Sequence, residues 1–348
     1  MGLWFIFILF WEVFMISIAI AGTGMIVKEI LPVLSELEQI NITALCGTKR
    51  SETTLIELCD NSSIPYEYTD YELMIKDIAD RKIRVDAVYI ATPNNLHYDM
   101  AMAAINKGIN VFLEKPFVSS YSDAVRLIEN ARKKKVFLLE AISNQYLPIY
   151  KALRNALPKV GQIKYVECNF SQYSSKFDRF AAGEYFRVFD LECDGGVLMD
   201  LNVYNIHIVA GLFGEPLKVN YLPNMMRNVD TSGVLTLSYP DFTSCCVAAK
   251  DCQGPSRTLI QGTKGYLLIE APANSLDSTL VFYSTQDKTF EDIFVPESGH
   301  RMAYEFRELD RIISSGAYDE CIRRQEETLC VCRILSDAHS TLRTLQCS

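Results

Sequence analysis

The sequence predicts an α/β protein: a doubly wound parallel sheet, followed by an α/β domain with a large open, mostly antiparallel sheet. Three observations predict this fold class. Between residues 15 and 145, short apolar runs alternate with helical patterns, as they do in βαβ units. The first apolar run ends in a glycine loop that opens a helix. After about residue 145, strands follow one another without intervening helices, which is typical of antiparallel sheets.

The same patterns place each element in order. The first sheet is expected to have strands at 15-21, 40-46, 85-91, 109-114 and 136-140, and helices near 25-38, 51-60, 71-82, 96-107 and 120-134. The second part is expected to have one helix, a strand at 162-173, an irregular stretch through Phe189, an apolar helix at 196-213, strands between 216 and 285, and helices near 300-315 and 323-345. We therefore expect a nucleotide-binding domain at 15-145 and a C-terminal domain for substrate binding and oligomerisation at 146-348.

Composition narrows the function classes. The chain has 348 residues, of which 49% are hydrophobic and 22% charged, and this balance is typical of a globular protein. The net charge of -9 argues against non-specific nucleic-acid binding, which needs clustered cations. The eleven cysteines contain no Cys-x-x-Cys pair, so we expect free thiols in a reducing cytoplasm and no metal site.

The amino terminus is unusually apolar, since Glu12 is the only charged residue before Lys28. A secretion signal would need a positively charged start, and none is present. If the first strand begins near residue 15, the 14 residues before it give a helix of about 21 Å, which is shorter than a bilayer core of roughly 30 Å. We therefore expect no membrane span, and we interpret 1-14 as an extension upstream of a functional start at Met15.

The glycine loop after the first strand predicts a dinucleotide site. Gly22 permits a tight turn, and Gly24 lets the backbone approach a pyrophosphate at the amino end of the helix. The third position of the fingerprint is Val27, where Gly or Ala is usual. The residues expected to line the cofactor here are Gly22, Thr23, Gly24, Met25 and Ile26.

The end of the second strand favours NADP over NAD. NAD-binding domains usually carry an acidic residue there that accepts the ribose hydroxyls, but this chain continues with Thr48, Lys49 and Arg50. Two cations and a hydroxyl suit a 2′-phosphate. The alternative is an ordinary exposed basic turn.

Two further loops lie at the carboxyl ends of predicted strands, where open α/β sheets bind ligands. Thr92, Pro93 and Asn94 follow the third strand of the list above and are expected to line the ribose and nicotinamide side, with His97 just inside the next helix as either a ligand contact or a packing residue. Glu114 and Lys115 follow the next strand, directly before a proline, and both are expected to line the cofactor. The ammonium of Lys115 is thus placed for a ligand, although a lone lysine in such a loop is more often a surface residue.

The apolar helix at 196-213 is expected to face Lys115 from the other side of a ligand cleft. Asp200, Tyr204 and His207 are spaced i, i+4 and i+7, so they share one face of a helix that is otherwise apolar. Buried polar groups need partners, either in a structural network or in a ligand cavity. The substrate is also expected to contact residues after the last predicted strand of the first sheet and in the loop over the cleft: Asn144, Gln145, Tyr173 and Lys176.

Taken together, these residues resemble the Gfo/Idh/MocA oxidoreductases from Met15 almost to the chain end. The resemblance rests on Gly22-Thr23-Gly24, Ala91-Thr92-Pro93-Asn94 with His97, Glu114-Lys115-Pro116, and Gly195-Gly196-Val197-Leu198-Met199-Asp200. It implies a Rossmann domain, a second domain whose open sheet often mediates homodimers or homotetramers, and hydride transfer between a nicotinamide and a sugar-like alcohol or ketone. It also implies that Lys115 lies beside the nicotinamide and that its bond to Pro116 is often cis.

The resemblance leads to a mechanism with three catalytic residues. We expect Tyr204 to transfer the proton, Lys115 to polarise the substrate oxygen and lower the tyrosine pKa, and Asp200 to orient both, with Lys115 and Tyr204 able to exchange roles. NADP is the preferred cofactor, with NAD as the alternative. His207 stands where many relatives have an acid. Because some members of the family are non-catalytic, an NAD(P)-binding regulator or scaffold remains the alternative function.

Overall fold

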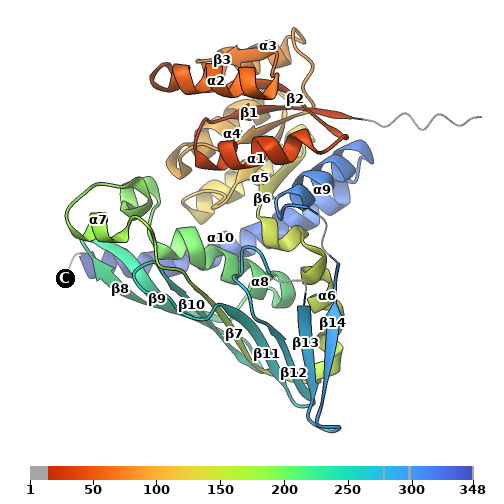
Figure 1. The fold of residues 1–348 in the computed structure, drawn as a ribbon, viewed down its shortest axis with the longest axis vertical. Helices are drawn as coiled ribbons and strands as arrows, with labels where there is room; N and C mark the ends of the chain where they lie inside the picture. The colour runs from red at the N-terminus through yellow and green to blue at the C-terminus, as the bar shows by residue number, and fades with distance from the viewer. Residues whose placement is uncertain (1–14, 277–278, 297–298, 347–348) are drawn as a thin grey trace, which may run out of the picture.

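The computed structural model describes residues 15–276, 279–296 and 299–346. It contains two sheets stacked along the long axis of the molecule, with long helices between them (Figure 1). The expected extension at 1-14 lies outside the described residues.

The first sheet is parallel throughout and has six strands in the order β3-β2-β1-β4-β5-β6. This is the order of a dinucleotide-binding sheet, in which the carboxyl ends of β1 and β4 meet at the point where the order reverses. The central strands form because their apolar runs are buried on both faces. The strands are β1 (Ile16–Ala21), β2 (Ile40–Cys46), β3 (Tyr66–Tyr68), β4 (Ala87–Ile90), β5 (Asn110–Glu114) and β6 (Leu138–Ala141).

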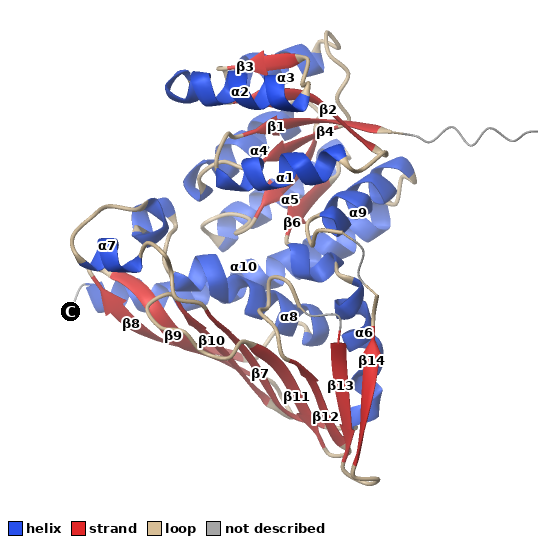
Figure 2. Cartoon of the chain, in the orientation of Figure 1, coloured by secondary structure: helices blue, strands red, loops and turns tan. Residues whose placement is uncertain are grey.

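Helices cover both faces of this sheet (Figure 2). One face packs against α1 (Met25–Ser35), α2 (Glu52–Ser62) and α9 (Ala303–Ser314). The other packs against α3 (Tyr71–Ala79), α4 (His97–Asn106) and α5 (Tyr121–Lys134). Helix α9 comes from the part of the chain assigned above to the C-terminal domain, yet its Phe306 packs edge-on against Tyr89 and Phe112 of the first sheet, at centroid distances of 5.1 and 5.2 Å.

The second sheet has eight strands in the order β14-β13-β12-β11-β7-β10-β9-β8 and is antiparallel except between β7 and β10. Its strands are β7 (Ile163–Ser171), β8 (Lys218–Met226), β9 (Val229–Ser238), β10 (Thr243–Ala249), β11 (Arg257–Gly262), β12 (Gly265–Ile269), β13 (Thr279–Ser284) and β14 (Thr289–Phe294). Helices lie on one face only, and the other face is bare of helices (Figure 1). They are α6 (Pro148–Ala156), α8 (Val203–Phe213) and α10 (Tyr318–Gln346), and a short helix α7 (Phe177–Ala181) lies in the loop after β7.

The predicted fold class is confirmed, and most predicted elements exist within a few residues of their expected bounds. Strands β3 and β14 were not predicted. Both are short and mostly exposed, so neither has the apolar run that marks a buried strand. The predicted helix at 196-213 is in fact a π-helical turn at Leu198–Asn202 followed by α8.

One described helical segment, Leu191–Phe213, is long and apolar enough to cross a membrane by length and composition alone. However, 72% of its most apolar stretch is buried inside the protein, which is what the core helix of a folded domain shows. It carries the residues described next.

Candidate active site

Lys115 lies at the carboxyl edge of the first sheet and reaches across to the π-helical turn of the second domain. Its Nζ donates to Asp200 Oδ1 and to the main-chain oxygen of Asp200, each at 2.9 Å. The peptide bond between Lys115 and Pro116 is cis. Two side chains predicted from separate parts of the sequence are therefore in direct contact, and both face partly outward, with 16% and 31% of their side chains exposed.

A second lysine, Lys250, follows β10 and binds the other oxygen of the same carboxylate, with Nζ 2.5 Å from Asp200 Oδ2. Burial works to raise the pKa of Asp200, but the two lysines outweigh it and hold the pKa well below its usual range. Burial likewise works to lower the pKa of Lys115, and Asp200 outweighs it, so that pKa is raised. The carboxylate and the Lys115 ammonium are thus both charged at neutral pH.

Tyr204 lies beneath this ion pair, one turn further along the helix. The ammonium of Lys115 sits 4.9 Å from the centroid of its ring. Burial raises the pKa of Tyr204, and Lys115 only partly offsets that effect. The expected lowering by the lysine is therefore outweighed, and the hydroxyl stays protonated at neutral pH. Within the described residues this hydroxyl makes no hydrogen bond, which leaves it available to a ligand.

Glu114 and His97, two of the residues predicted to line the cofactor, instead form hydrogen bonds with the loop that carries Lys115. Glu114 is buried and accepts from the Tyr89 hydroxyl at 2.5 Å and from the Lys115 backbone at 3.1 Å. His97 is 0% exposed, and its two ring nitrogens lie 3.0 Å from the carbonyl oxygens of Pro116 and Thr92. His97 therefore joins the two loops rather than facing a ligand, and of the two interpretations above the packing one fits.

The glycine loop has the shape that a pyrophosphate requires. Gly22 has φ of +131°, and a Cβ there would overlap the carbonyl oxygen of Ala91 at the end of β4. A Cβ on Gly24 would meet no protein atom within 4 Å, so the space in front of Gly24 is open. The amino end of α1 has no side-chain cap and no acidic residue in its first turn. Its backbone N–H groups are thus free to bind an anion, and the residues fit a dinucleotide.

The basic turn after β2 is also suited to a phosphate. Thr48, Lys49 and Arg50 lie on the surface at this edge, where Thr48 and Ser51 cap a short 3-10 turn. In the part of the chain that the structure describes, neither Lys49 nor Arg50 has a hydrogen bond or an ion pair. Both charges are therefore available. Thr92, Pro93 and Asn94 lie at the end of β4, and Asn94 Nδ2 donates to the Asp194 carbonyl across the cleft at 3.1 Å.

Three of the residues predicted for the substrate pack around α8, with Asn144 and His207 buried and Gln145 half-buried. Asn144 Nδ2 donates to the Tyr204 carbonyl at 2.9 Å, Gln145 Nε2 donates to the His207 carbonyl at 2.9 Å, and His207 Nε2 lies 3.3 Å from Glu140 Oε1. The structure thus divides the predicted stripe: Asp200 and Tyr204 meet Lys115, whereas His207 faces the end of β6. His207 points elsewhere because a π-helical turn precedes α8 and because the buried Glu140 lies beside His207. The spacing of residues along a regular helix reveals neither feature.

The remaining two lie in the loop that precedes α7. Tyr173 is 41% exposed and donates to Asp178 Oδ1 at 2.6 Å. Lys176 is half-buried, with its ammonium 5.9 Å from the centroid of the Phe186 ring. No contact in the described residues joins either one to Lys115.

A cleft of about 210 Å³ opens between the two domains and reaches Asp200. The residues that line this cleft are Pro93, Asn94, Arg187, Val188, Cys193, Asp194, Gly195 and Asp200. Of these, only Pro93, Asn94 and Asp200 were predicted as site residues from the sequence. Lys250 was also missed, although it carries the signal that identified Lys115: a lysine directly after an apolar strand.

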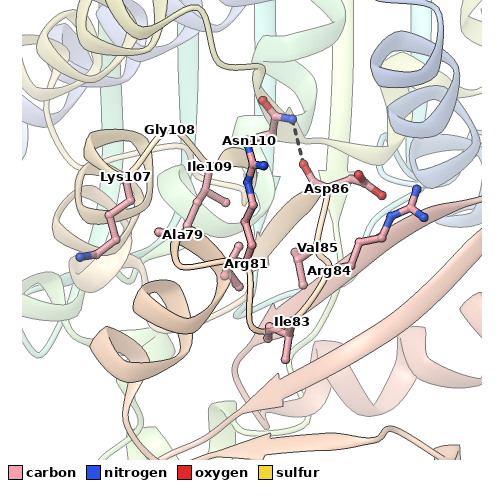
Figure 3. Close-up of a pocket in the computed structure, with 11 residues that line it drawn as sticks. Ala79, Arg81, Ile83, Arg84, Val85, Asp86, Lys107, Gly108, Ile109 and Asn110 are labelled. Atoms are coloured by element: carbon pink, nitrogen blue, oxygen red, sulfur yellow. Dashed lines mark hydrogen bonds between the residues drawn. The ribbon is translucent and has the colours of Figure 1, made fainter.

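A larger pocket of about 490 Å³ lies at the opposite edge of the first sheet, before β4 and β5 (Figure 3). Arg81, Arg84 and Lys107 line it and have no ion pair among the described residues. Figure 3 shows the Arg84 guanidinium and the Lys107 ammonium on opposite sides, so they do not converge on one ligand. The pocket is remote from the loops at the carboxyl edge, and the smaller cleft is the candidate active site.

Comparison with known proteins agrees with this geometry. Residues 16–141 match the model of an oxidoreductase family with an NAD-binding Rossmann fold, and residues 152–268 match a GFO/IDH/MocA C-terminal domain. The chain is 31% identical to the uncharacterized oxidoreductase YgjR of Escherichia coli, over 84% of this chain and 86% of that protein. It is 29% identical to the scyllo-inositol 2-dehydrogenase (NADP(+)) IolU of Bacillus subtilis, over 94% and 97%.

Among solved structures, KijD10, a 3-ketoreductase from Actinomadura kijaniata in complex with NADP and TDP-benzene, superimposes with a TM-score of 0.80. The match covers 94% of this chain and 97% of that one at 19% identity, so it establishes a likeness of fold.

Proposed function

The chain belongs to the Gfo/Idh/MocA family of NAD(P)-dependent oxidoreductases, and from this premise we propose that it interconverts a ketone and a secondary alcohol in the cleft beside Lys115. The observation that carries the proposal is the Lys115–Asp200 contact, because it brings a charged donor of the nucleotide-binding sheet to the cleft wall of the second domain. The proposed substrate is a sugar, a polyol or a dihydrodiol. Relatives named as scyllo-inositol, D-xylose and trans-1,2-dihydrobenzene-1,2-diol dehydrogenases support that class.

The proposed mechanism assigns one role to each residue. When bound, the nicotinamide supplies or accepts the hydride. Lys115 donates a hydrogen bond to the substrate oxygen and stabilises negative charge on it. Tyr204, whose raised pKa keeps its hydroxyl protonated, donates the proton during reduction and takes it back during oxidation. Asp200 keeps the ammonium charged and fixes its position. A panel of sugars, inososes, dihydrodiols and dicarbonyls, assayed by NADPH oxidation or NADP reduction, tests the proposal; binding of NADPH with no turnover across the panel would contradict it.

We also propose that NADP is preferred, held by the glycine loop at its pyrophosphate and by Thr48, Lys49 and Arg50 at its 2′-phosphate. The absence of an acid at the end of β2 and the unpaired cations in the described turn support this.

Replacing Arg50 by Ala is expected to raise KM for NADPH by roughly 10–100-fold, because a charge-assisted hydrogen bond to the phosphate is lost. KM for NADH should stay within about twofold, since NADH has no phosphate at this position. Arg84→Ala is the matched control, because Arg84 is also exposed and unpaired among the described residues but lies at the far edge of the sheet. An acidic residue is not introduced at Gly47, directly after β2, because a Cβ there would lie 2.9 Å from Ser51 Oγ and would disturb the turn. Equal changes in KM for both cofactors would argue against the assignment.

We further propose that two or four copies associate through the bare face of the second sheet. Tyr266, Tyr283 and Phe290 are register partners on neighbouring strands, and their rings form a continuous row with centroids 5.1 and 5.0 Å apart. Phe290 is 66% exposed in the single chain. An exposed apolar row of this kind is typical of an interface between subunits.

Tyr283→Glu is expected to convert the oligomer to a monomer, because it places a charge in the middle of the row. Light scattering after gel filtration measures the mass. Tyr66→Glu, at an exposed position on the edge strand β3, is the control and should leave the mass unchanged. A wild-type protein that is already monomeric would contradict the proposal.

A cytoplasmic location is proposed as well, because the ten described cysteines are all free.

A further inference from the structure

Lys250 is a buried lysine directly after β10 with a single ion-pair partner in the described structure. Only 4% of the residue is exposed, and its Nζ lies 2.5 Å from Asp200 Oδ2. The ammonium also sits 4.9 Å from the centroid of the Phe189 ring, and its backbone N–H donates to the Thr231 carbonyl at 2.8 Å. Burying an ammonium is unfavourable unless it is paired, so the carboxylate of Asp200 is what holds this lysine in place.

The Asp200 carboxylate is shared between two lysines, one oxygen to each. Lys250 takes Oδ2, and Lys115 takes Oδ1 together with the main-chain oxygen. The two lysines differ in access: the Lys115 side chain is 16% exposed and that of Lys250 only 5%. A carboxylate held at one oxygen from behind cannot rotate freely, so its other oxygen stays directed at Lys115.

The backbone around Asp200 needs such support. It lies in the π-helical turn Leu198–Asn202, a conformation that is rare and is found mainly at functional sites. The buried Asp230 at the start of β9 accepts from the Leu198 N–H at 2.8 Å and so caps this turn. Asp230 directly precedes Thr231, which accepts from the backbone of Lys250. Neighbouring strands of the second sheet thus hold both the backbone and the side chain of the turn.

We infer that Lys250 is a positioning residue for the reaction, which acts by fixing and charge-compensating Asp200 so that Asp200 in turn holds Lys115 at the cleft. This inference rests on the proposed function. It assigns to Lys250 no contact with the substrate or the cofactor, because its ammonium lies behind the carboxylate.

The arrangement predicts a particular pH dependence. The groups that face Asp200 are Lys115 after β5, Lys250 after β10 and Tyr204 on α8, while Arg187 lines the same cleft and Asp230 lies beyond Lys250. Burial favours the neutral acid, and the lysines keep the pKa of Asp200 below its ordinary value. Loss of Lys250 removes one of them, so the pKa of Asp200 rises and the carboxylate is lost at a higher pH.

The test is a double-mutant cycle on the full chain. Lys250→Met is expected to lower kcat about tenfold or more while the Kd of NADPH changes by less than about twofold. In an Asp200→Asn background the same substitution is expected to change kcat by less than about twofold, because its path to Lys115 is already broken. The acidic limb of the kcat–pH profile should move to higher pH in Lys250→Met and stay in place in Lys250→Arg, which keeps the charge.

Lys159→Met is the matched control, because Lys159 also lies 2.5 Å from a carboxylate, that of Glu291, and 5.3 Å from the Phe282 ring, but on the surface. A loss of kcat that recurs undiminished in the Asp200→Asn background, or an acidic limb that does not move, would reduce Lys250 to a structural residue and overturn the inference. A Lys250→Met protein that keeps its rate also overturns the inference, and a Lys115→Ala variant in the same series then shows which claim fails. If Lys115→Ala keeps its rate as well, the proposed function is wrong; if Lys115→Ala loses activity, only the role of Lys250 is wrong.

Discussion

Replacing Lys115 by Met is expected to lower kcat by roughly 10²–10⁴-fold, the range over which a positioned acid–base or charge-stabilising group contributes. The substitution keeps the length of the side chain and removes the charge that the substrate oxygen would meet. Affinity for NADPH should change little, because the pyrophosphate site lies at a different loop, after β1. Stopped-flow single-turnover rates together with a fluorescence titration of NADPH measure both quantities.

Lys76→Met is the matched control. Lys76 lies 2.9 Å from a carboxylate, as Lys115 does, but the pair is on the exposed surface of α3 and is expected to matter little. A Lys115→Met enzyme with near-normal kcat, or one whose activity falls only because NADPH no longer binds, would contradict the role given to this lysine.

The second large effect is expected at the glycine loop, where Gly22 is needed for folding and Gly24 for cofactor binding. Gly22→Ala forces a Cβ into the carbonyl oxygen of Ala91 at a positive φ. It should lower the free energy of unfolding by about 2–5 kcal/mol, the sum of a strained backbone and an overlap in a packed site. Gly24→Ala meets open space at an ordinary φ of −74°. Its free energy of unfolding should change by less than about 1 kcal/mol.

The two variants therefore separate stability from binding. Gly24→Ala should weaken NADPH binding by roughly tenfold or more, because the added methyl occupies the space where the backbone would approach the pyrophosphate. Urea unfolding and an NADPH titration on each variant measure the pair. Tight NADPH binding by a well-folded Gly24→Ala protein would show that the cofactor does not lie against this loop.

The fold was largely predictable because its buried elements carry periodic apolar patterns. Strands β1 and β5 are apolar runs buried on both faces, and β2 is buried from Thr43 to Cys46. Each was expected within a residue or two of where it lies. The exposed β3 carries no such run. The packing of α9 against β4 and β5 was beyond sequence reasoning, because an amphipathic helix does not reveal which of two sheets it covers.

The candidate site was partly predictable for a related reason. Lys115, Asp200 and Tyr204 were expected together and are in contact, because a strand end and a polar stripe on an apolar helix are local signals. The partner of His207 was not predictable from its own helix, since Glu140 comes from β6. Nor was the double use of the Asp200 carboxylate, which depends on how β10 of the second sheet ends beside the turn.

Transfer of an isotopic label from cofactor to substrate tests directly whether this protein catalyses hydride transfer. Wild-type enzyme is incubated with NADPH carrying deuterium at the transferred position of the nicotinamide, together with the panel of sugars, inososes and dicarbonyls, and the products are analysed by mass spectrometry. We expect a product with one deuterium on the new carbinol carbon, formed by the wild type and at most at trace levels by Lys115→Met. NADPH that binds to the wild type but yields no deuterated product with any of the panel would contradict this expectation.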